Sequence, residues 1–419
     1  MTREIERPSY LEQLERRRMN GMVKVVTGLR RCGKSYLLFN MFFRRLVSSG
    51  VPADHIITVP LDDDEYEELR DRKALRQYIR NRVKDENPYY VLLDEIQFVE
   101  GFSGLLNGLL RTPNLDLYVT GSNSRLLSSD VLTEFRGRGD EVRVRPLTFG
   151  EFLPACGLGP EAAWRAYLAY GGMPLVLSRE TPRDKEQYLK DLFRLTYLRD
   201  VQERYGLRGD GTLDSVVNVL ASSAGSLTNP HKLAGTFTSN GYKGVTDKTI
   251  ARYIGHLKDA FLIERAEQFD VKGKKYITTQ SKYYFADVGL RNARLNFRQQ
   301  EPSHLMENVI YNELCFRGYS VDVGVVPRLE AGKDGKAAWK RYEIDFVCNR
   351  GSRRLYVQSA WELPDREKTK QESRSLILSG DSFQKIIVVG SPVLPWQTEE
   401  GIAVVGVQDF LTKPELLDF

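Results

Sequence analysis

One stretch of the sequence has the residue types and the spacing of a phosphate-binding loop. The apolar run "VKVV" leads to Gly28, and after four further residues come Gly33, Lys34 and Ser35. This order fits G-x-x-x-x-G-K-[ST], in which glycines let backbone N–H groups point at phosphate oxygens and the following helix adds its positive dipole end. We expect Lys34 to reach the β- and γ-phosphates of ATP and the Ser35 hydroxyl to coordinate Mg²⁺. The alternative is an ordinary glycine-containing turn between a strand and a helix.

The predicted nucleotide contacts cover the whole loop and the start of the helix after it. They are Gly28, Arg30, Arg31, Cys32, Gly33, Lys34, Ser35 and Tyr36. A second motif, "YYVLLDE", is an apolar strand that ends in Asp94 and Glu95. Asp94 is expected to hold the Mg²⁺ shell together with Ser35, and Glu95 to polarise the attacking water. The alternative is that these acids are solvent-exposed residues at the end of an apolar strand. Their position after a phosphate loop favours the catalytic role.

Polar residues also follow the next apolar strand, in "LYVTGSNS". Thr120, Ser122 and Asn123 stand there, and the Asn123 amide is predicted to orient water or to contact the γ-phosphate. The alternative is a polar turn that caps the next helix. Further along, "EFRGRGDEVRV" places Arg136 and Arg138 between a helix and a strand. An arginine at this point serves the neighbouring subunit's nucleotide in oligomeric ATPases, and the alternative is solvated surface charge.

The composition indicates a globular protein of the cytoplasm. The chain has 419 residues and a formal net charge of +5, which permits a polyanionic partner without requiring one. Its four cysteines form no C-x-x-C pair, so we expect neither a disulfide framework nor a structural zinc site. No apolar run approaches the roughly 18 residues that a membrane-spanning helix needs, and the amino terminus lacks the apolar core of a signal peptide.

Hydrophobic patterning predicts an α/β protein of four parts. Strand-like runs alternate with helical patterns up to about residue 150, which favours a parallel sheet flanked by helices. We expect a nucleotide-binding core over 1–150, a helical lid over 151–208, a winged helix over 209–295 and a nuclease-like α/β domain over 296–419.

These motifs together resemble a known family. The set "GLRRCGKS", "VLLDEIQ", "VTGSNS", "FRGR" and "PLTFGEF" is similar to the AAA+ superfamily, and more closely to prokaryotic ATPases that pair an AAA domain with a C-terminal region of the DUF4143 type. The resemblance implies that Lys34 and Ser35 belong to Walker A and that Asp94 and Glu95 belong to Walker B. It implies that Asn123 is sensor 1 and that Arg138 or Arg136 is the arginine finger. "YGGMP" at 170–174 resembles the G-x-P lid motif, although it also fits a plain loop.

The middle segment has the rhythm of a winged helix-turn-helix. Apolar residues recur at three- and four-residue steps after Thr246 and Asp247, and two strands then flank a basic turn. This arrangement can place a helix in the major groove of DNA and a basic wing on phosphate. The predicted DNA contacts are Lys248, Arg252, Lys272, Lys274 and Lys275, with Lys258 on the same polar face. The alternative is a winged helix that binds protein.

The last segment resembles a PD-(D/E)xK nuclease whose catalytic residues are degenerate. "YEIDFV" supplies Asp345, but Gln358 stands where the fold has Glu, and Ala360 stands where it has Lys. A helical Glu, either Glu307 or Glu313, would be a further ligand. Gln binds a hard cation poorly and Ala moves no proton, so we predict a nuclease-like fold without nuclease activity.

The leading hypothesis is an oligomeric, Mg²⁺-dependent ATPase that acts on DNA, with branched DNA as one candidate. Its partners would be DNA and further copies of itself in a ring, and no membrane is expected. The alternative is a regulatory ATPase whose C-terminal parts bind a protein. Stimulation of hydrolysis by DNA and a steep salt dependence of binding would separate the two.

Overall fold

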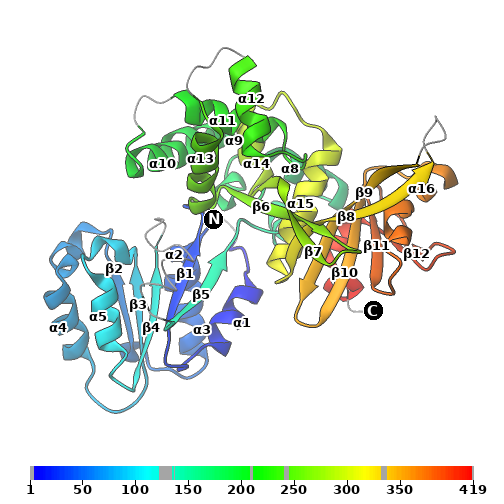
Figure 1. The fold of residues 1–419 in the computed structure, drawn as a ribbon. Coiled ribbons are helices and arrows are strands. Elements are labelled where there is room, and N and C mark those ends of the chain that lie inside the picture. Colours follow the sequence, from blue (N-terminus) through cyan, green and yellow to red (C-terminus); the bar gives the residue numbers. More distant parts are fainter. Residues whose placement is uncertain are drawn as a thin grey trace. The chain divides into compact units, whose positions relative to one another are not determined.

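The chain forms two compact units, residues 1–146 and 147–419, each with its own sheet and its own hydrophobic core (Figure 1). The computed structural model describes residues 4–121, 135, 137–207, 211–239, 245–331 and 337–417. Among these residues, no helix combines the length and the apolar character that a bilayer crossing requires.

The first unit is built on a five-stranded parallel sheet with the order β2-β3-β4-β1-β5. Its strands are β1 (Val23–Gly28), β2 (Ile56–Pro60), β3 (Tyr89–Asp94), β4 (Leu115–Thr120) and β5 (Gly139–Val144). The three central strands β1, β3 and β4 are buried at every residue, because helices cover both faces of a parallel sheet. The prediction of a parallel sheet flanked by helices before about residue 150 is confirmed.

Helical segments connect these strands. They are α1 (Pro8–Arg16), α2 (Lys34–Tyr36), η1 (Leu37–Phe42), α3 (Phe43–Ser48), η2 (Ala53–His55), η3 (Asp64–Arg70), α4 (Arg72–Arg82), η4 (Ile96–Phe98) and α5 (Phe102–Leu109). From α2 to α3 the helical path is continuous, with a π-helical middle. Helices α4 and α5 bury one apolar stripe each in the core of the sheet, which leaves their other faces to solvent.

The second unit begins with a helical region. Its helices are α7 (Phe149–Cys156), α8 (Pro160–Tyr170), η6 (Pro174–Val176), α9 (Pro182–Asp191), η7 (Leu192–Leu198), α10 (Arg199–Arg204), α11 (Gly211–Ser222), α12 (Pro230–Ser239), α13 (Asp247–Asp259) and α14 (Val288–Arg294). Thr148 and Glu151 form a reciprocal capping box that starts α7. The "YGGMP" turn packs tightly here, since a Cβ on Gly172 would lie 2.1 Å from the Leu147 carbonyl oxygen.

A mixed eight-stranded sheet forms the rest of the second unit, in the order β12-β13-β11-β10-β9-β8-β6-β7. Its strands are β6 (Ile263–Asp270), β7 (Lys275–Phe285), β8 (Ser320–Ala331), β9 (Ala337–Arg350), β10 (Arg353–Ala360), β11 (Gln384–Val389), β12 (Trp396–Gln397) and β13 (Ala403–Gly406). The accompanying helices are α15 (Pro302–Phe316), α16 (Arg366–Leu378), α17 (Val407–Thr412) and η8 (Pro414–Leu417). The β6–β7 hairpin, predicted as a wing, joins this sheet through parallel pairing of β6 with β8.

Candidate nucleotide-binding site

The loop after β1 has the backbone that phosphate binding needs. Gly28 has φ +134°, and a Cβ there would lie 2.0 Å from the carbonyl oxygen of Val144 on β5, so only glycine fits. Gly33 has φ +99° immediately before the helical segment that begins at Lys34. Arg31, at φ +62°, is also left-handed. These conformations curl the chain between strand and helix, as the sequence pattern predicted.

Lys34 keeps its charge available for a ligand. Its side chain is buried, and its Nζ donates to the backbone oxygens of Gly28 at 3.0 Å and Leu29 at 2.9 Å. Both partners are neutral, so they do not cancel the ammonium charge. An ammonium group has three N–H donors, and the third remains for a phosphate oxygen.

Cys32 holds the loop in place from the inside. Its thiol is buried and donates to the Val144 carbonyl at 3.5 Å, while its own carbonyl accepts from Nη1 of Arg7 at 3.3 Å. Arg7 also donates to the Arg145 carbonyl at 2.8 Å, so it ties the loop to the end of β5. Arg7 was not predicted from the sequence, because nothing in its own segment marks it. Arg30, Ser35 and Tyr36 are exposed along the loop and helix.

The carboxylate predicted to hold Mg²⁺ lies beside the loop serine. Asp94 ends β3 with 5% of its surface exposed, and it accepts a hydrogen bond from the Thr120 hydroxyl at the end of β4. Burial raises the pKa of Asp94 above its usual value, and the nearby hydroxyls of Thr120 and Ser35 only partly offset this. Ser35 and Asp94 therefore come together from two different strand ends.

Glu95 stands next to this pair in an unusual conformation. Its φ of 49° is left-handed, a region that non-glycine residues seldom adopt, and the Gln97 amide donates to its carboxylate. Its backbone N–H donates to the Thr120 hydroxyl oxygen at 3.0 Å. Strain of this kind concentrates at functional sites, where the surrounding structure holds it in place.

The donor set fits Mg²⁺. The ion prefers hard oxygen ligands and is usually held by one or two side chains together with substrate phosphates. Ser35 and Asp94 would supply a hydroxyl and a carboxylate to it, and the bound ion would neutralise charge on the phosphate oxygens.

Arg138 lies at the opposite edge of the sheet from the phosphate loop. Its carbonyl accepts from the Val23 amide at 2.9 Å, and β5 pairs with β1 from Val23–Gly139 to Gly28–Val144. The two ends of β1 are about 16 Å apart at 3.3 Å per residue. Arg138 is therefore remote from the phosphate loop of its own chain. Ser122, Asn123 and Arg136 lie outside the described residues.

The predicted DNA contacts are exposed on the second unit. Thr246 is the N-cap of α13, and its buried face matches the predicted apolar positions. Lys248, Arg252 and Lys258 are exposed on that helix. The turn between β6 and β7 exposes its lysines, Lys272, Lys274 and Lys275. This turn is held beside β8, since the Val271 amide donates to the Val325 carbonyl at 3.0 Å.

The nuclease-like residues meet on neighbouring strands of the second unit. The Gln358 side-chain oxygen on β10 accepts from the Asp345 amide on β9 at 3.3 Å, and Asp345 accepts from the Ser359 amide at 2.8 Å. Glu307 of α15 belongs to the same cluster, whereas Glu313 pairs with Arg317 at 2.7 Å. Ala360 is buried within the hydrophobic core.

A lysine that the sequence analysis missed fills this cluster. Lys282 of β7 places its Nζ 2.8 Å from Glu307, 2.7 Å from Glu343 and 3.5 Å from Asp345. Burial lowers the pKa of Lys282, but the three carboxylates outweigh burial and raise it above its usual value. Burial raises the pKa of Glu307; the Lys282 ammonium offsets this only in part, and the Asp345 carboxylate raises the pKa further. The cluster is an ion-pair network between one ammonium and three carboxylates.

A parallel sheet with a phosphate loop at one strand end and a carboxylate at another is the arrangement of phosphate-loop nucleotide-binding domains. Residues 20–153 match the family model described as "AAA domain". Residues 161–301 match the model "Domain of unknown function (DUF8612)", where the sequence resemblance implied a DUF4143-type region. An uncharacterized protein of Haemophilus influenzae is 35% identical over 416 residues, covering 98% of this chain and 99% of that protein. The chain belongs to the same family as that protein.

More distant similarities were also found. An uncharacterized protein of Methanocaldococcus jannaschii is 24% identical over 367 residues, covering 83% of this chain and 77% of the other. The Aeropyrum pernix ORC1 protein in complex with DNA has 13% identity and a TM-score of 0.31, over 70% of this chain and 93% of that chain. AMPPCP-bound DnaA from Aquifex aeolicus has 16% identity and a TM-score of 0.30, over 62% and 79%. Similarities at this level do not establish a shared function. The AAA domain itself implies nucleotide binding.

Proposed function

We propose that this protein is a Mg²⁺-dependent, ATP-hydrolysing AAA+ protein that couples hydrolysis to the binding or remodelling of DNA. The observation that carries the ATPase part is that Lys34 and Asp94 are both buried with neutral hydrogen-bond partners, and that Ser35 lies beside Asp94. Lys34 binds the β- and γ-phosphates, and Ser35 with Asp94 holds the metal. Glu95 accepts a proton from the attacking water, which its position after Asp94 permits.

The protein works as an oligomer, with a ring as the proposed form. Arg138 is too far from the phosphate loop of its own chain to contact the γ-phosphate there, so a role in hydrolysis requires a neighbouring copy. Mixing Arg138→Ala with Lys34→Ala tests this. Each variant alone is expected to be inactive, and the mixture to regain activity because some sites combine an intact loop with an intact arginine. If the mixture stays inactive, Arg138 does not act across a subunit boundary.

Coupling to DNA is supported by the exposed basic residues of α13 and of the β6–β7 turn, which fit a winged-helix module over 209–295. The test is ATP hydrolysis without nucleic acid and then with duplex, single-stranded and four-way-junction DNA, at low and moderate salt. Stimulation by at least one form is expected. A flat rate with no DNA binding would remove DNA from the proposal.

The nuclease-like part, over 296–419, is proposed to bind without cleaving. Ala360 supplies no lysine, and Lys282 occupies the acidic cluster. Labelled DNA incubated with Mg²⁺ or Mn²⁺ is expected to remain intact, and cleavage that depends on Asp345 would contradict this.

A regulatory ATPase that binds a protein is the second candidate function. One observation favours it: Leu329 and Trp339 pair across β8 and β9, and they are 53% and 71% exposed. Exposed large apolar pairs of this kind mark protein contacts. If this candidate holds, Trp339→Ser weakens capture of a partner protein and leaves DNA-free hydrolysis unchanged.

A further inference from the structure

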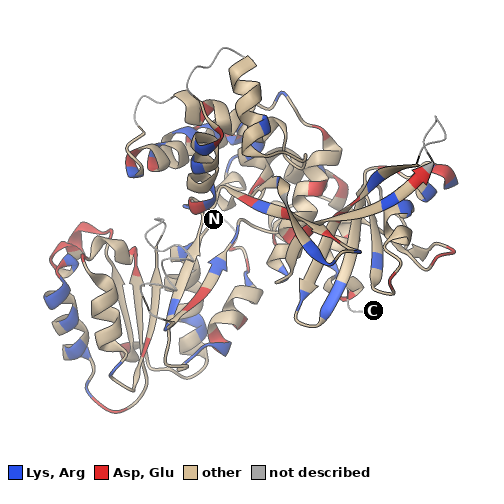
Figure 2. Ribbon diagram, viewed as in Figure 1, with Lys and Arg blue, Asp and Glu red and all other residues tan. Residues whose placement is uncertain are grey.

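A row of arginines follows one side of α4 in the first unit. Arg72, Arg76 and Arg80 are four residues apart, so they project from successive turns of one helix face. The helix carries five basic residues and no acidic one, and Figure 2 shows this basic run along α4. Like charges on one helix face repel each other, and a bound anion would relieve this repulsion.

Glycines of α5 make the floor on which these arginines lie. A Cβ on Gly104 would lie 3.7 Å from Nη1 of Arg72, and a Cβ on Gly108 would lie 3.5 Å from Nη2 of Arg76. Glycine inside a helix is unfavourable compared with alanine, so two of them in one eight-residue helix need a reason. Side chains at these positions would fill the space beneath the guanidinium groups.

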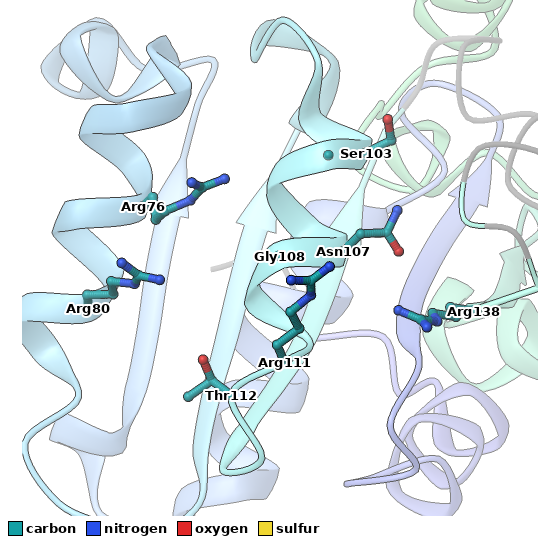
Figure 3. Close-up of a pocket in the computed structure, with 9 residues that line it drawn as sticks. Arg76, Arg80, Ser103, Asn107, Gly108, Arg111, Thr112 and Arg138 are labelled. Atoms are coloured by element: carbon teal, nitrogen blue, oxygen red, sulfur yellow. The ribbon is translucent and has the colours of Figure 1, made fainter.

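Arg76, Arg80, Gly104 and Gly108 line a groove of about 920 Å³, and Arg72 lies beside it, next to Gly104. Arg111 follows α5 and Arg138 precedes β5, and in Figure 3 their guanidinium groups and those of Arg76 and Arg80 gather around α5. The neutral donors Ser103, Asn107 and Thr112 lie between them. No described carboxylate comes within 4.0 Å of any of these arginines.

The groove is separate from the nucleotide site. Arg111 comes before β4 and Arg138 before β5, so this end of the groove lies at the amino-terminal edge of the sheet. The phosphate loop and Asp94 lie at the carboxyl-terminal edge. The end of the groove that holds Arg111 and Arg138 is therefore apart from the phosphate loop of the same chain.

We propose that this groove binds the phosphodiester backbone of a nucleic-acid strand. Guanidinium groups match phosphate oxygens in bidentate geometry, and hydroxyl and amide groups commonly add backbone contacts. Arg72 to Arg80 span about 12 Å at 1.5 Å per residue. Measured along the axis of a duplex, that length corresponds to about three to four nucleotides of one strand, at an axial rise of about 3.4 Å each. A free polyphosphate chain presents the same chemistry, and the test separates the two. The choice of nucleic acid as the ligand rests on the proposed coupling to DNA. The groove residues differ from the DNA contacts proposed on α13 and the β6–β7 turn.

The test is fluorescence anisotropy of labelled duplex and single-stranded DNA over a range of salt concentrations. The groove variant is Arg76→Gln/Arg80→Gln/Arg111→Gln. The control is Lys73→Gln/Arg82→Gln/Lys84→Gln, which removes the same charge from exposed residues on or next to α4 that do not line the groove. The groove variant is expected to lower the slope of log K against log salt by about 2.7 on duplex DNA, and to weaken binding about 10²–10³-fold at 0.1 M salt. The control is expected to change affinity less than about 3-fold, and both variants to bind ATP normally.

A second variant tests the shape of the groove without changing its charge. Gly104→Leu/Gly108→Leu keeps every arginine and fills the floor, and we expect it to weaken DNA binding as well. The proposal would be overturned if the groove and control variants lost DNA affinity equally, or if the filled variant lost none. Either result would mean that DNA binding depends on the overall positive charge and not on the groove.

Two further measurements, polyphosphate binding and a variant of the β6–β7 turn, distinguish failure of the groove proposal from failure of the proposed function. If wild-type protein ignores DNA but binds inorganic polyphosphate through these arginines, the anion site stands and nucleic acid is overturned as its ligand. If DNA binds and only Lys272→Gln/Lys274→Gln/Lys275→Gln weakens it, the groove is overturned while the proposed function survives. If neither polyanion binds, both the groove and the DNA coupling fall.

Discussion

Two regions of this protein each contain a buried lysine and a buried aspartate, and they use these charges in opposite ways. At the phosphate loop, Lys34 donates to backbone carbonyls, and Asp94 accepts from the Thr120 hydroxyl. In the C-terminal sheet, Lys282 lies within ion-pair distance of Glu307, Glu343 and Asp345. In the first region the lysine and the aspartate each have neutral hydrogen-bond partners. In the second region the lysine and the carboxylates are paired with each other.

The difference shows how a ligand site can be told from a structural ion pair. A charge whose only partners are neutral dipoles gains strongly when an opposite charge arrives. A charge that already has carboxylate partners gains little, and its role is to stabilise the fold around it. On this basis we propose the phosphate loop as the site for Mg²⁺ and phosphates, and we interpret the Lys282 cluster as an ion-pair network that stabilises the fold.

The largest effect is expected from Lys34→Ala. The variant removes charge-assisted bonds to two phosphates, each worth about 1.5–3 kcal/mol, so ATP affinity should fall about 10²–10⁴-fold. Isothermal titration calorimetry measures this, with Lys84→Ala as the control at an exposed lysine of the same unit. Tight ATP binding by Lys34→Ala would mean that the loop does not hold phosphate.

Glu95→Gln separates binding from hydrolysis at the same site. Replacing the carboxylate with an amide removes the general base but keeps the shape, so hydrolysis should fall about 10²–10⁴-fold while ATP binding persists. A phosphate-release assay gives the rate, and Glu100→Gln, at an exposed position nearby, should behave as wild type. Unchanged turnover in Glu95→Gln would remove this residue from the mechanism.

Lys282→Met tests the other half of the comparison. Removing one partner of a buried ion network leaves the others uncompensated, so the second unit should lose about 3–5 kcal/mol of unfolding free energy. Chemical denaturation measures the loss, and Lys370→Met serves as the exposed control. The emptied cluster should also acquire stabilisation by Mn²⁺ that the wild type lacks. Wild-type stability in Lys282→Met would show that the network holds nothing together.

The smallest effect is a pH dependence at Asp94, whose pKa burial raises. In the ligand-free protein, the contribution of this carboxyl to stability is fully present below the usual aspartate pKa and is lost as the pH rises through the raised pKa. Mg²⁺-dependent ATP binding should change in the opposite direction, because the ion needs the carboxylate. Two quantities are measured by calorimetry between about pH 4 and 8: the unfolding free energy of the ligand-free protein and the Mg²⁺-dependent affinity for ATP. Both should change with pH as described in the wild type and not in Asp94→Asn. Identical pH profiles for the two proteins would contradict the assignment.

The sheet of the first unit was predictable because its signals are local. A continuous apolar run such as "YYVLLDE" predicts a buried strand, and the order of loop, lysine and serine is read directly from the chain. The expected pairing of Ser35 with Asp94 rested on the order of the two motifs, and the parallel sheet brings them together because the carboxyl ends of its strands lie at one edge.

The Lys282 cluster and the arginine groove were not predictable in the same way. Lys282 precedes an apolar stretch of β7, and nothing local indicates that Glu307 on α15 and Asp345 on β9 surround it. The four-residue spacing of Arg72, Arg76 and Arg80 was visible, but the glycines beneath them belong to another helix. Both features depend on which elements become neighbours in the folded chain.

The most direct test of the central claim is the effect of Mg²⁺ on ATP affinity in three proteins: wild type, Asp94→Asn and Asp345→Asn. Titration calorimetry in EDTA and in Mg²⁺ gives, for each protein, the ratio of the ATP affinity with Mg²⁺ to the affinity without it. If the phosphate loop is the metal site, Mg²⁺ tightens ATP binding in wild type and Asp345→Asn but not in Asp94→Asn. The claim would be contradicted if Mg²⁺ still tightened ATP binding in Asp94→Asn, or if it no longer did so in Asp345→Asn.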